Sequence, residues 1–268
     1  MISFRPIGLA SSHPFTDDTA LVAAEARDAE RLGYATLWRS GNLPMLTAAV
    51  RATTTIPVAT GIIPVSSVPP ADVIATYREL NQDHPGRFVV GLGGAHNARP
   101  LDTLNTYLDE LDAAGVEAGS RILAALGPQM LALARDRAAG AYPYLVTPSY
   151  VEEARAMLGP DPRLAVLLMV MPTTDRETAR RAAATPLDFL AKQGGYRRNL
   201  LRQGFGEADI DAVSDRLLDG IAAWGSPERI AARIDEYLAA GADQVVLRIL
   251  GVDDLALWRV RLADSLLG

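Results

Sequence analysis

Two of the three histidines in this sequence follow segments that we predict to be strands. These are His13 and His96. The charge of histidine changes near neutral pH, so each side chain is a candidate proton donor or phosphate ligand. The alternative for each is a hydrogen bond to a loop carbonyl. The third histidine, His84, lies before the start of a predicted strand and not after its end. This position is on the opposite face of the fold and indicates a structural role.

Glycines at two further strand ends indicate binding of an anion and of a flat ligand. Gly127 and Pro128 begin a predicted helix, and the free N–H groups of a helix N-terminus attract anions. Gly93 and Gly94 follow an earlier strand, where glycine lets the backbone approach a ligand closely. The alternatives are an ordinary tight turn at Gly127 and a flexible loop at Gly93.

The composition excludes several kinds of chemistry. The 268 residues include no cysteine, so there is no thiolate nucleophile and no cysteine-bound metal. The motifs H-x-H, H-E-x-x-H and G-x-S-x-G do not occur, and we expect no metal centre. The only lysine, Lys192, lies away from the predicted strand ends, which disfavours Schiff-base chemistry. We therefore expect a bound organic cofactor to carry the reaction.

These residues are positioned by an alternation of strands and helices along the whole chain. Thr16 is the expected N-cap of the first helix, and residues 173–223 are expected to be mostly helical, with breaks at 194–195 and 203–206. Eight strands each followed by helix predict an α/β fold, a (β/α)8 TIM barrel, as one domain over residues 1–268. A doubly wound open sheet would place a glycine-rich phosphate turn after an early strand, and none is found. The predicted strands are Phe4–Leu9, Tyr34–Trp38, Pro57–Ile63, Phe88–Leu92, Arg121–Leu126, Tyr142–Val146, Leu164–Met171 and Gln244–Leu250.

Charge and hydropathy narrow the possible partners. The net charge of −6 argues against nucleic acid, which needs clustered cations. The longest apolar run, Leu164 to Met171, is far shorter than the roughly 20 residues of a membrane helix. The N-terminus lacks a basic start followed by a long apolar core, so we expect no signal peptide. We predict a cytoplasmic protein that acts on a small-molecule substrate, without a membrane partner.

Six segments, in this order, resemble the bacterial luciferase-like monooxygenase superfamily. They are GYATLW, PVATGIIPV, PPADVIATY, HPGRFVVGLGG, ILAALGPQMLALARDRAAGAYPYLV and WGSPERIAARIDEYLAAGADQVVL. The branch that they resemble most comprises oxidoreductases that depend on the deazaflavin coenzyme F420. The resemblance implies a luciferase-like barrel with a helical insertion after strand seven, a deazaflavin or flavin across the strand ends, and a homodimer.

The resemblance also assigns roles to residues at the strand ends. It implies a bulge with a non-prolyl cis peptide at about Thr60, Gly61 and Ile62, which backs the cofactor ring. Gly93, Gly94 and His96 are expected to contact cofactor or substrate. The cofactor phosphate is expected at the turn after strand five, at Ala124, Ala125, Gly127, Pro128 and Gln129.

One strand end departs from the family pattern. Many relatives end strand two with an acidic residue followed by histidine, where this chain has Arg39-Ser40-Gly41-Asn42. Either His96 or His13 takes over the proton transfer, or the reaction differs. Arg39 either binds an anionic part of the cofactor or substrate or forms a surface salt bridge. Asn42, at the same strand end, is a further candidate cofactor contact.

Three functions follow from these expectations. The first is hydride transfer between coenzyme F420 and a small organic substrate, with a cationic channel for the acidic cofactor tail formed by Arg39, Arg99 and Arg248. The second is an FMN-dependent monooxygenase. The third, from another class, is a barrel that binds a flavin or deazaflavin without turnover.

Overall fold

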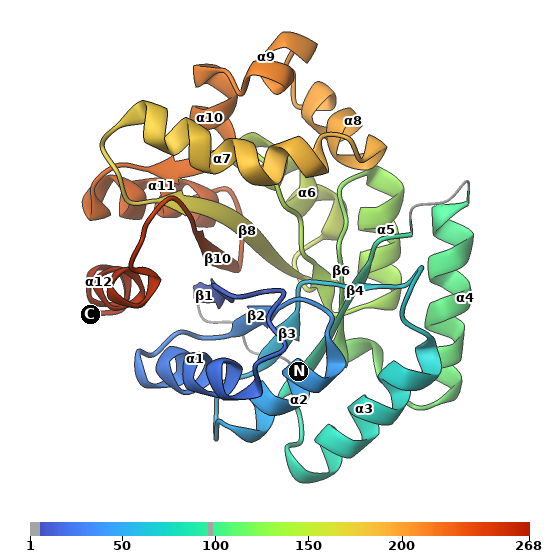
Figure 1. Ribbon diagram of the computed structural model, residues 1–268. Helices are drawn as coiled ribbons and strands as arrows, with labels where there is room; N and C mark the ends of the chain where they lie inside the picture. The colour runs from blue at the N-terminus through green and yellow to red at the C-terminus, as the bar shows by residue number, and fades with distance from the viewer. Residues whose placement is uncertain (1–5, 96–98) are drawn as a thin grey trace.

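A closed barrel of parallel strands forms the centre of the computed structural model, which describes residues 6–95 and 99–268 (Figure 1). Seven strands pair in chain order, and β10 closes the circle by pairing with both β8 and β1. The predicted (β/α)8 barrel is therefore confirmed, and the open sheet is excluded. The barrel strands are β1 (Ile7–Ala10), β2 (Leu37–Arg39), β3 (Val58–Thr60), β5 (Phe88–Gly93), β6 (Arg121–Leu123), β7 (Gly140–Ala141), β8 (Arg163–Met171) and β10 (Gln244–Ile249).

Helices surround the strands, and the local sequence explains where they begin. Proline occupies the first helical position in five of them, where its missing N–H costs nothing. The first helix is capped by Asp18, whose carboxylate accepts from the N–H groups of Ala20 and Leu21, and not by Thr16 as predicted. The outer helices are α1 (Thr19–Arg31), α2 (Leu43–Arg51), α3 (Pro70–Asp83), α4 (Pro100–Ala113), α5 (Pro128–Arg137), α6 (Pro148–Leu158), α11 (Pro227–Ala239) and α12 (Leu255–Leu267).

The expected helical insertion follows β8 and gathers on one side of the barrel (Figure 1). Its helices are α7 (Arg176–Leu190), α8 (Gly194–Arg202), α9 (Glu207–Ala212) and α10 (Asp215–Ile221). The break at 203–206 lies where it was predicted, but the predicted break at 194–195 is wrong, because the helices separate at 191–193 and Gly194 and Gly195 begin α8. A short strand, β9 (Ala222–Trp224), was not predicted and pairs with the end of β8.

Two apolar cores lie on the two faces of the barrel wall. The outer core lies between strands and outer helices, and the inner core fills the barrel and continues under the insertion. Neighbours along β5 illustrate this division, since Val90 belongs to the outer core and Val89 to the inner core. Deep in the barrel, the Thr36 hydroxyl donates to Gln244 at 2.8 Å, and the Trp38 indole donates to Thr36 at 2.8 Å. These contacts fix the lower end of the barrel.

Several strands differ in extent from the prediction: β2 is Leu37–Arg39 rather than Tyr34–Trp38, and β3 is Val58–Thr60 rather than Pro57–Ile63. The predicted strand Tyr142–Val146 pairs instead through Gly140–Ala141, with one further bridge at Tyr144. Pro143 has no N–H to donate, which interrupts the ladder there. The predicted strand Arg121–Leu126 ends at Leu123, because the chain then turns toward α5. In the described part of the chain, no helix is long and apolar enough to cross a membrane.

Candidate functional site

A backbone bulge at the end of β3 forms one side of the barrel mouth. Thr60, Gly61 and Ile62 lead from β3 into β4 (Ile63–Pro64), which pairs with β5. The peptide bond between Gly61 and Ile62 is cis, at the position that the resemblance implied. Gly61 is exposed and Ile62 is half-buried, so this piece of backbone borders open space.

Glycines on β5 allow the bulge to pack closely. The buried Thr60 hydroxyl bonds both to the N–H of Gly91, at 2.6 Å, and to its carbonyl, at 2.5 Å. A Cβ at Gly91 would lie 1.9 Å from the Thr60 carbonyl oxygen, and one at Gly93 would lie 2.8 Å from the Cβ of Ala124. Gly94 has a φ of +72°. Packing within the protein thus accounts for these glycines, and the cofactor contact of Gly93 and Gly94 stays a prediction.

Two stacked aromatic rings fill the barrel beneath the bulge. Tyr142 stacks on Trp38, with ring centroids 3.9 Å apart and an interplanar angle of 7°. A Cβ at Gly61 would lie 3.0 Å from the Tyr142 ring, which places the ring directly against the bulge. Burial raises the pKa of Tyr142 well above its ordinary value, and Tyr144 raises it further while Arg248 opposes the rise. The phenol is therefore neutral at physiological pH.

A second tyrosine and an arginine lie beside Tyr142. Tyr144 follows it by two residues, so both side chains point into the barrel. Arg248, on β10, donates to the Tyr144 hydroxyl at 3.3 Å and lies 5.6 Å from its ring centre. Tyr196 of α8 packs edge-on to Tyr144, with 6.4 Å between ring centroids. The tyrosines were not among the predicted site residues, although the alternation in Tyr142-Pro143-Tyr144 is a signal for two side chains on one face.

The turn from β6 to α5 holds the residues that were predicted to bind an anion. Gly127 is the N-cap of α5 and supplies no side chain, while Pro128 and Gln129 are exposed. The Tyr150 hydroxyl donates to the carbonyls of Ala125, at 3.2 Å, and Leu126, at 3.0 Å, and holds the turn in place. The N-terminus of α5 is thus rigidly held and open.

The insertion adds a cation to this turn. Arg202 of α8 donates hydrogen bonds to the carbonyl of Leu126 and to the side chain of Asn199. Its guanidinium lies 3.8 Å from the point that a Cβ at Gly127 would occupy. Sequence reasoning did not find Arg202, because 76 positions separate it from Leu126 and only the folded insertion brings the two together.

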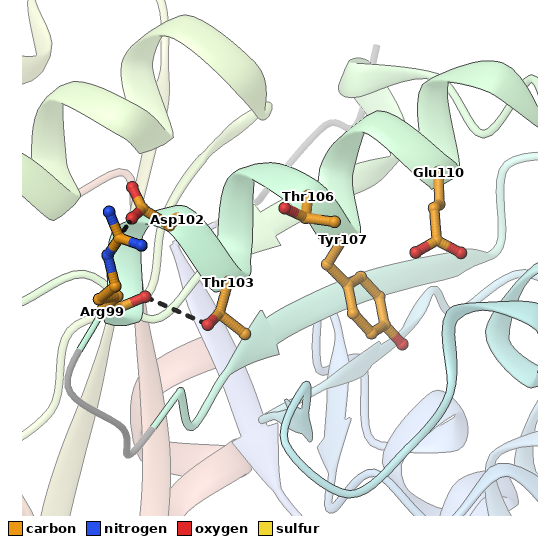
Figure 2. Close-up of a pocket in the computed structure, with 6 residues that line it drawn as sticks. All are labelled: Arg99, Asp102, Thr103, Thr106, Tyr107 and Glu110. Atoms are coloured by element: carbon orange, nitrogen blue, oxygen red, sulfur yellow. Dashed lines mark hydrogen bonds and ion pairs between the residues drawn. The ribbon is translucent and has the colours of Figure 1, made fainter.

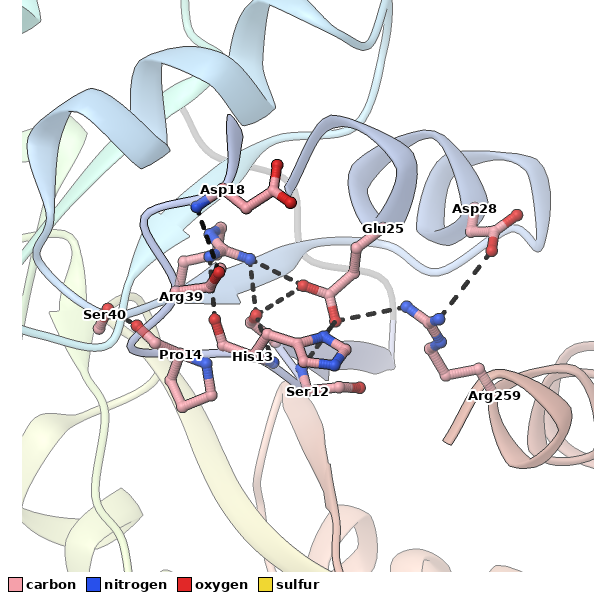
Figure 3. A network of polar contacts seen from close by, with 11 residues as sticks. Ser12, His13, Pro14, Asp18, Glu25, Asp28, Arg39, Ser40 and Arg259 are labelled. Atoms are coloured by element: carbon pink, nitrogen blue, oxygen red, sulfur yellow. Dashed lines mark hydrogen bonds and ion pairs between the residues drawn. The ribbon is translucent and has the colours of Figure 1, made fainter. Parts of the chain in front are cut away.

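A buried ion-pair network supports the loop after β1 (Figure 3). The carboxylate of Glu25, on α1, accepts from Arg39 at 2.7 Å and from the Ser11 hydroxyl at 2.6 Å. Its second oxygen accepts from the Ser12 N–H at 2.7 Å and from Arg259 of α12 at 3.3 Å. The side chains of Glu25 and Arg39 are 2% and 1% exposed. The network ties the loop to α1, β2 and α12.

Arg39 and Asn42 are engaged by the protein itself. Burial lowers the pKa of Arg39, while the Glu25 charge opposes that change. The expected surface salt bridge of Arg39 is wrong, since the pair is buried, and its guanidinium serves Glu25, Ser11 and the carbonyl of His13. Asn42 caps α2 and donates to Asp17 at 2.9 Å. Their predicted binding of cofactor remains a prediction that this geometry does not favour.

The two candidate histidines differ in what is known of their surroundings. His13 lies on the loop after β1, with its Nδ1 3.9 Å from Glu25 and its side chain 41% exposed. Its Nδ1 is enclosed and has no hydrogen-bond partner in the described part of the chain. His96 lies outside the described residues.

Two hollows lie on the outer helices. One, of about 400 Å³, lies along α4 and is lined by Arg99, Asp102, Thr103, Thr106, Tyr107 and Glu110 (Figure 2). The other, of about 540 Å³, lies between α11 and α12. Arg99 forms an ion pair with Asp102 at 2.9 Å. Of the three arginines expected to form one cationic channel, Arg248 lies at the barrel mouth, Arg39 is buried and Arg99 is at the start of α4.

The closed barrel and the helices around it define a (β/α)8 fold. The bulge, the β6–α5 turn and the tyrosines lie at one mouth of this barrel, where enzymes of this fold have their active sites. The family model for luciferase-like monooxygenases matches residues 4–118 and 121–244. The chain belongs to this family and is a luciferase-like oxidoreductase. No curated protein sequence matches it significantly.

Several solved structures share the fold. An F420-dependent secondary alcohol dehydrogenase in complex with an F420–acetone adduct is 16% identical, with a TM-score of 0.73 over 98% of this chain and 99% of that one. A coenzyme F420-dependent tetrahydromethanopterin reductase from Methanopyrus kandleri is 17% identical, with a TM-score of 0.69 over 99% and 98%. A type II Baeyer–Villiger monooxygenase from Pseudomonas putida, in complex with FMN, is 15% identical, with a TM-score of 0.69 over 97% and 96%. At these identities the likeness concerns the fold.

Proposed function

We propose that this oxidoreductase transfers a hydride between coenzyme F420 and a small organic substrate. The observation that carries the proposal is the cationic helix α8, which brings Arg202 onto the β6–α5 turn. Arg198 precedes Arg202 by four residues and shares its helix face. Among the described residues, Arg198 and Arg202 form no ion pair with a carboxylate, whereas Arg197 of the same helix pairs with Glu207 and Asp211. A phosphate with further acidic groups attached fits such a surface.

The residues present fit the cofactor in two respects. The N-terminus of α5 and Arg202 suit a phosphate group, and Gly127 leaves room for it. The exposed backbone of Gly61 and the half-buried Ile62 suit the face of a planar ring. A bound deazaflavin supplies and accepts the hydride, while the chain binds and orients it. The apolar inner core beneath keeps water away from the lower face of the site.

An FMN-dependent monooxygenase is the second candidate. The same turn and Arg202 suit the FMN phosphate, and a structural neighbour contains FMN. FMN ends at that phosphate, so it leaves Arg198 without a ligand group. This difference favours the longer acidic tail of F420. The third candidate is a barrel that binds the cofactor without turnover. The binding experiment below does not distinguish it from an enzyme, so an activity assay is needed.

Titration with three cofactors tests the proposal. We expect F420 to bind more tightly than FMN, and FMN more tightly than a deazaflavin riboside without phosphate. Arg202→Gln removes a charged hydrogen-bond donor, worth about 1.5–3 kcal/mol, so F420 affinity should fall by at least about tenfold. The affinity for the riboside should not change.

The control variant is Arg51→Gln, which removes an exposed arginine that pairs with Glu79 on the outside of the barrel. Its affinity for F420 should match that of the wild type. Equal binding of FMN and F420 would contradict the choice of cofactor. An unchanged F420 affinity in Arg202→Gln would show that the phosphate binds at another part of the barrel mouth.

The homodimer and the cytoplasmic location belong to the same proposal. The homodimer rests on the resemblance to the family, and the cytoplasmic location stays a prediction. Light scattering of the purified protein measures the first. A mass of one chain would contradict it.

A further inference from the structure

Three tyrosines and one arginine converge at the barrel mouth, and the proposed cofactor does not account for them. Tyr142 and Tyr144 come from the segment after β7, Tyr196 from α8 and Arg248 from β10. Tyr142 and Tyr144 are both 5% exposed, whereas Tyr196 and Arg248 are half-buried. Three separate parts of the fold thus bring hydrogen-bond donors to one place beside the exposed Gly61.

The hydroxyl of Tyr144 has a free proton. Arg248 is the donor in their contact at 3.3 Å, so the Tyr144 oxygen accepts and its own O–H points elsewhere. The nearby positive charge makes that proton easier to give away. Burial raises the pKa of Tyr144 and Arg248 opposes the rise, so the phenol is neutral and keeps its proton until a stronger base forms beside it.

Tyr142 offers a second donor. In the part of the chain that the structure describes, its hydroxyl has no hydrogen-bond partner. That hydroxyl is not among the enclosed polar atoms that lack a partner, so it stays open to the space beside the bulge. Its ring is held between Trp38 and the bulge, so the hydroxyl cannot turn away to find another partner. The hydroxyl can therefore donate to a ligand that enters this space.

We infer that Tyr142, Tyr144 and Arg248 form an oxyanion site for a carbonyl substrate, with Tyr144 as the proton donor. Two neutral O–H donors backed by a guanidinium suit an oxygen that gains negative charge during reaction. This inference rests on the proposed function for its hydride donor. It narrows the substrate class to aldehydes and ketones and, in reverse, to alcohols.

A bound reduced deazaflavin would supply the hydride that forms the new C–H bond at the carbonyl carbon, and the deazaflavin would be oxidised. The electrons of the C=O π bond move to the oxygen, which takes the proton of Tyr144. Arg248 stabilises the phenolate, and water returns a proton to it. The product is an alcohol.

Ligand binding to the protein without cofactor gives a first test. Isobutyramide, an unreactive carbonyl compound, is titrated against the protein, and the near-ultraviolet absorption of tyrosine is recorded. We expect a saturable change in the wild type, and at least about tenfold weaker binding in Tyr144→Phe. Tyr77→Phe, which removes a phenol hydroxyl that contacts Ser120 outside the barrel, is the matched control and should bind like the wild type. No saturable change in the wild type, or equal binding by Tyr144→Phe, overturns the site.

A measurement of turnover gives a second test. It distinguishes a failure of the proposed function from a failure of the oxyanion site. F420 affinity is measured for each variant first. If the wild type does not bind F420, the proposed function is wrong and the isobutyramide titration alone decides the oxyanion site. If it does bind, we expect reduction of small aldehydes or ketones, and Tyr144→Phe should lower kcat by about 10²-fold or more with F420 affinity unchanged. Reduction of no carbonyl compound by an F420-binding wild type, or an unchanged kcat in Tyr144→Phe, refutes the inference.

Discussion

Replacement of Glu25 by glutamine should destabilise the protein by about 3 kcal/mol. Loss of one partner of a buried ion pair costs about 3–5 kcal/mol, because the remaining charge stays buried without compensation. Here that charge is Arg39, whose side chain is 1% exposed. The amide oxygen of glutamine still accepts from the Ser12 N–H or from an arginine, which places the expected loss at the lower end of the range.

Urea denaturation followed by tryptophan fluorescence measures this loss as a change in the free energy of unfolding. The matched control is Glu79→Gln, which breaks an ion pair with Arg51 whose two side chains are about half exposed. Exposed pairs contribute about 0–1 kcal/mol, so the control should stay within that range. A loss below about 1 kcal/mol for Glu25→Gln, equal to that of the control, would refute the reasoning that this network supports the loop.

Three further results are expected. Gly91→Ala should lower the free energy of unfolding by about 1–3 kcal/mol or more, because its Cβ would lie 1.9 Å from the Thr60 carbonyl oxygen. Urea denaturation measures this loss, and a value under about 0.5 kcal/mol would contradict the packing argument. Gly127→Ala meets only a contact at 3.8 Å, so it should unfold like the wild type but bind F420 more weakly in a fluorescence titration. Burial favours protonation of Glu30, yet hydrogen bonds from Thr55 and neighbouring N–H groups outweigh it and lower its pKa from 4.5 to about 2. The stabilisation is therefore complete above pH 4.5 and is lost as the pH falls toward 2, and Glu30→Gln should flatten that part of the stability profile measured by urea denaturation.

The barrel was predictable because local signals repeat along the chain. Glycines that end helices, such as Gly33, Gly115 and Gly241, all have positive φ, and each precedes a strand or the turn that leads into one. The strand β9 was not predictable in the same way. Its residues Ala222 and Ala223 favour helix, and only pairing with Met169–Met171, more than fifty positions earlier, makes them a strand.

The site was predictable where a backbone conformation defines it, and less so where side-chain partners do. The bulge at Gly61 and the open helix start at Gly127 lie where they were expected. The ion pair of Arg39 with Glu25 was not predicted. Glu25 lies in an amphipathic helix, and no local pattern distinguishes it from the other charged residues there. Arg202 was missed because nothing near it in sequence shows that α8 reaches the β6–α5 turn.

The contact between Arg259 and Glu25 has a consequence for synthesis of the protein. A ribosome makes the chain in order, and 234 positions separate these two residues. The carboxylate of Glu25 therefore lacks its contact with Arg259 until α12 has emerged from the exit tunnel. Until then, the loop after β1 lacks part of its support. The rim of the barrel near β1 is among the first parts to be translated and among the last to reach its final form.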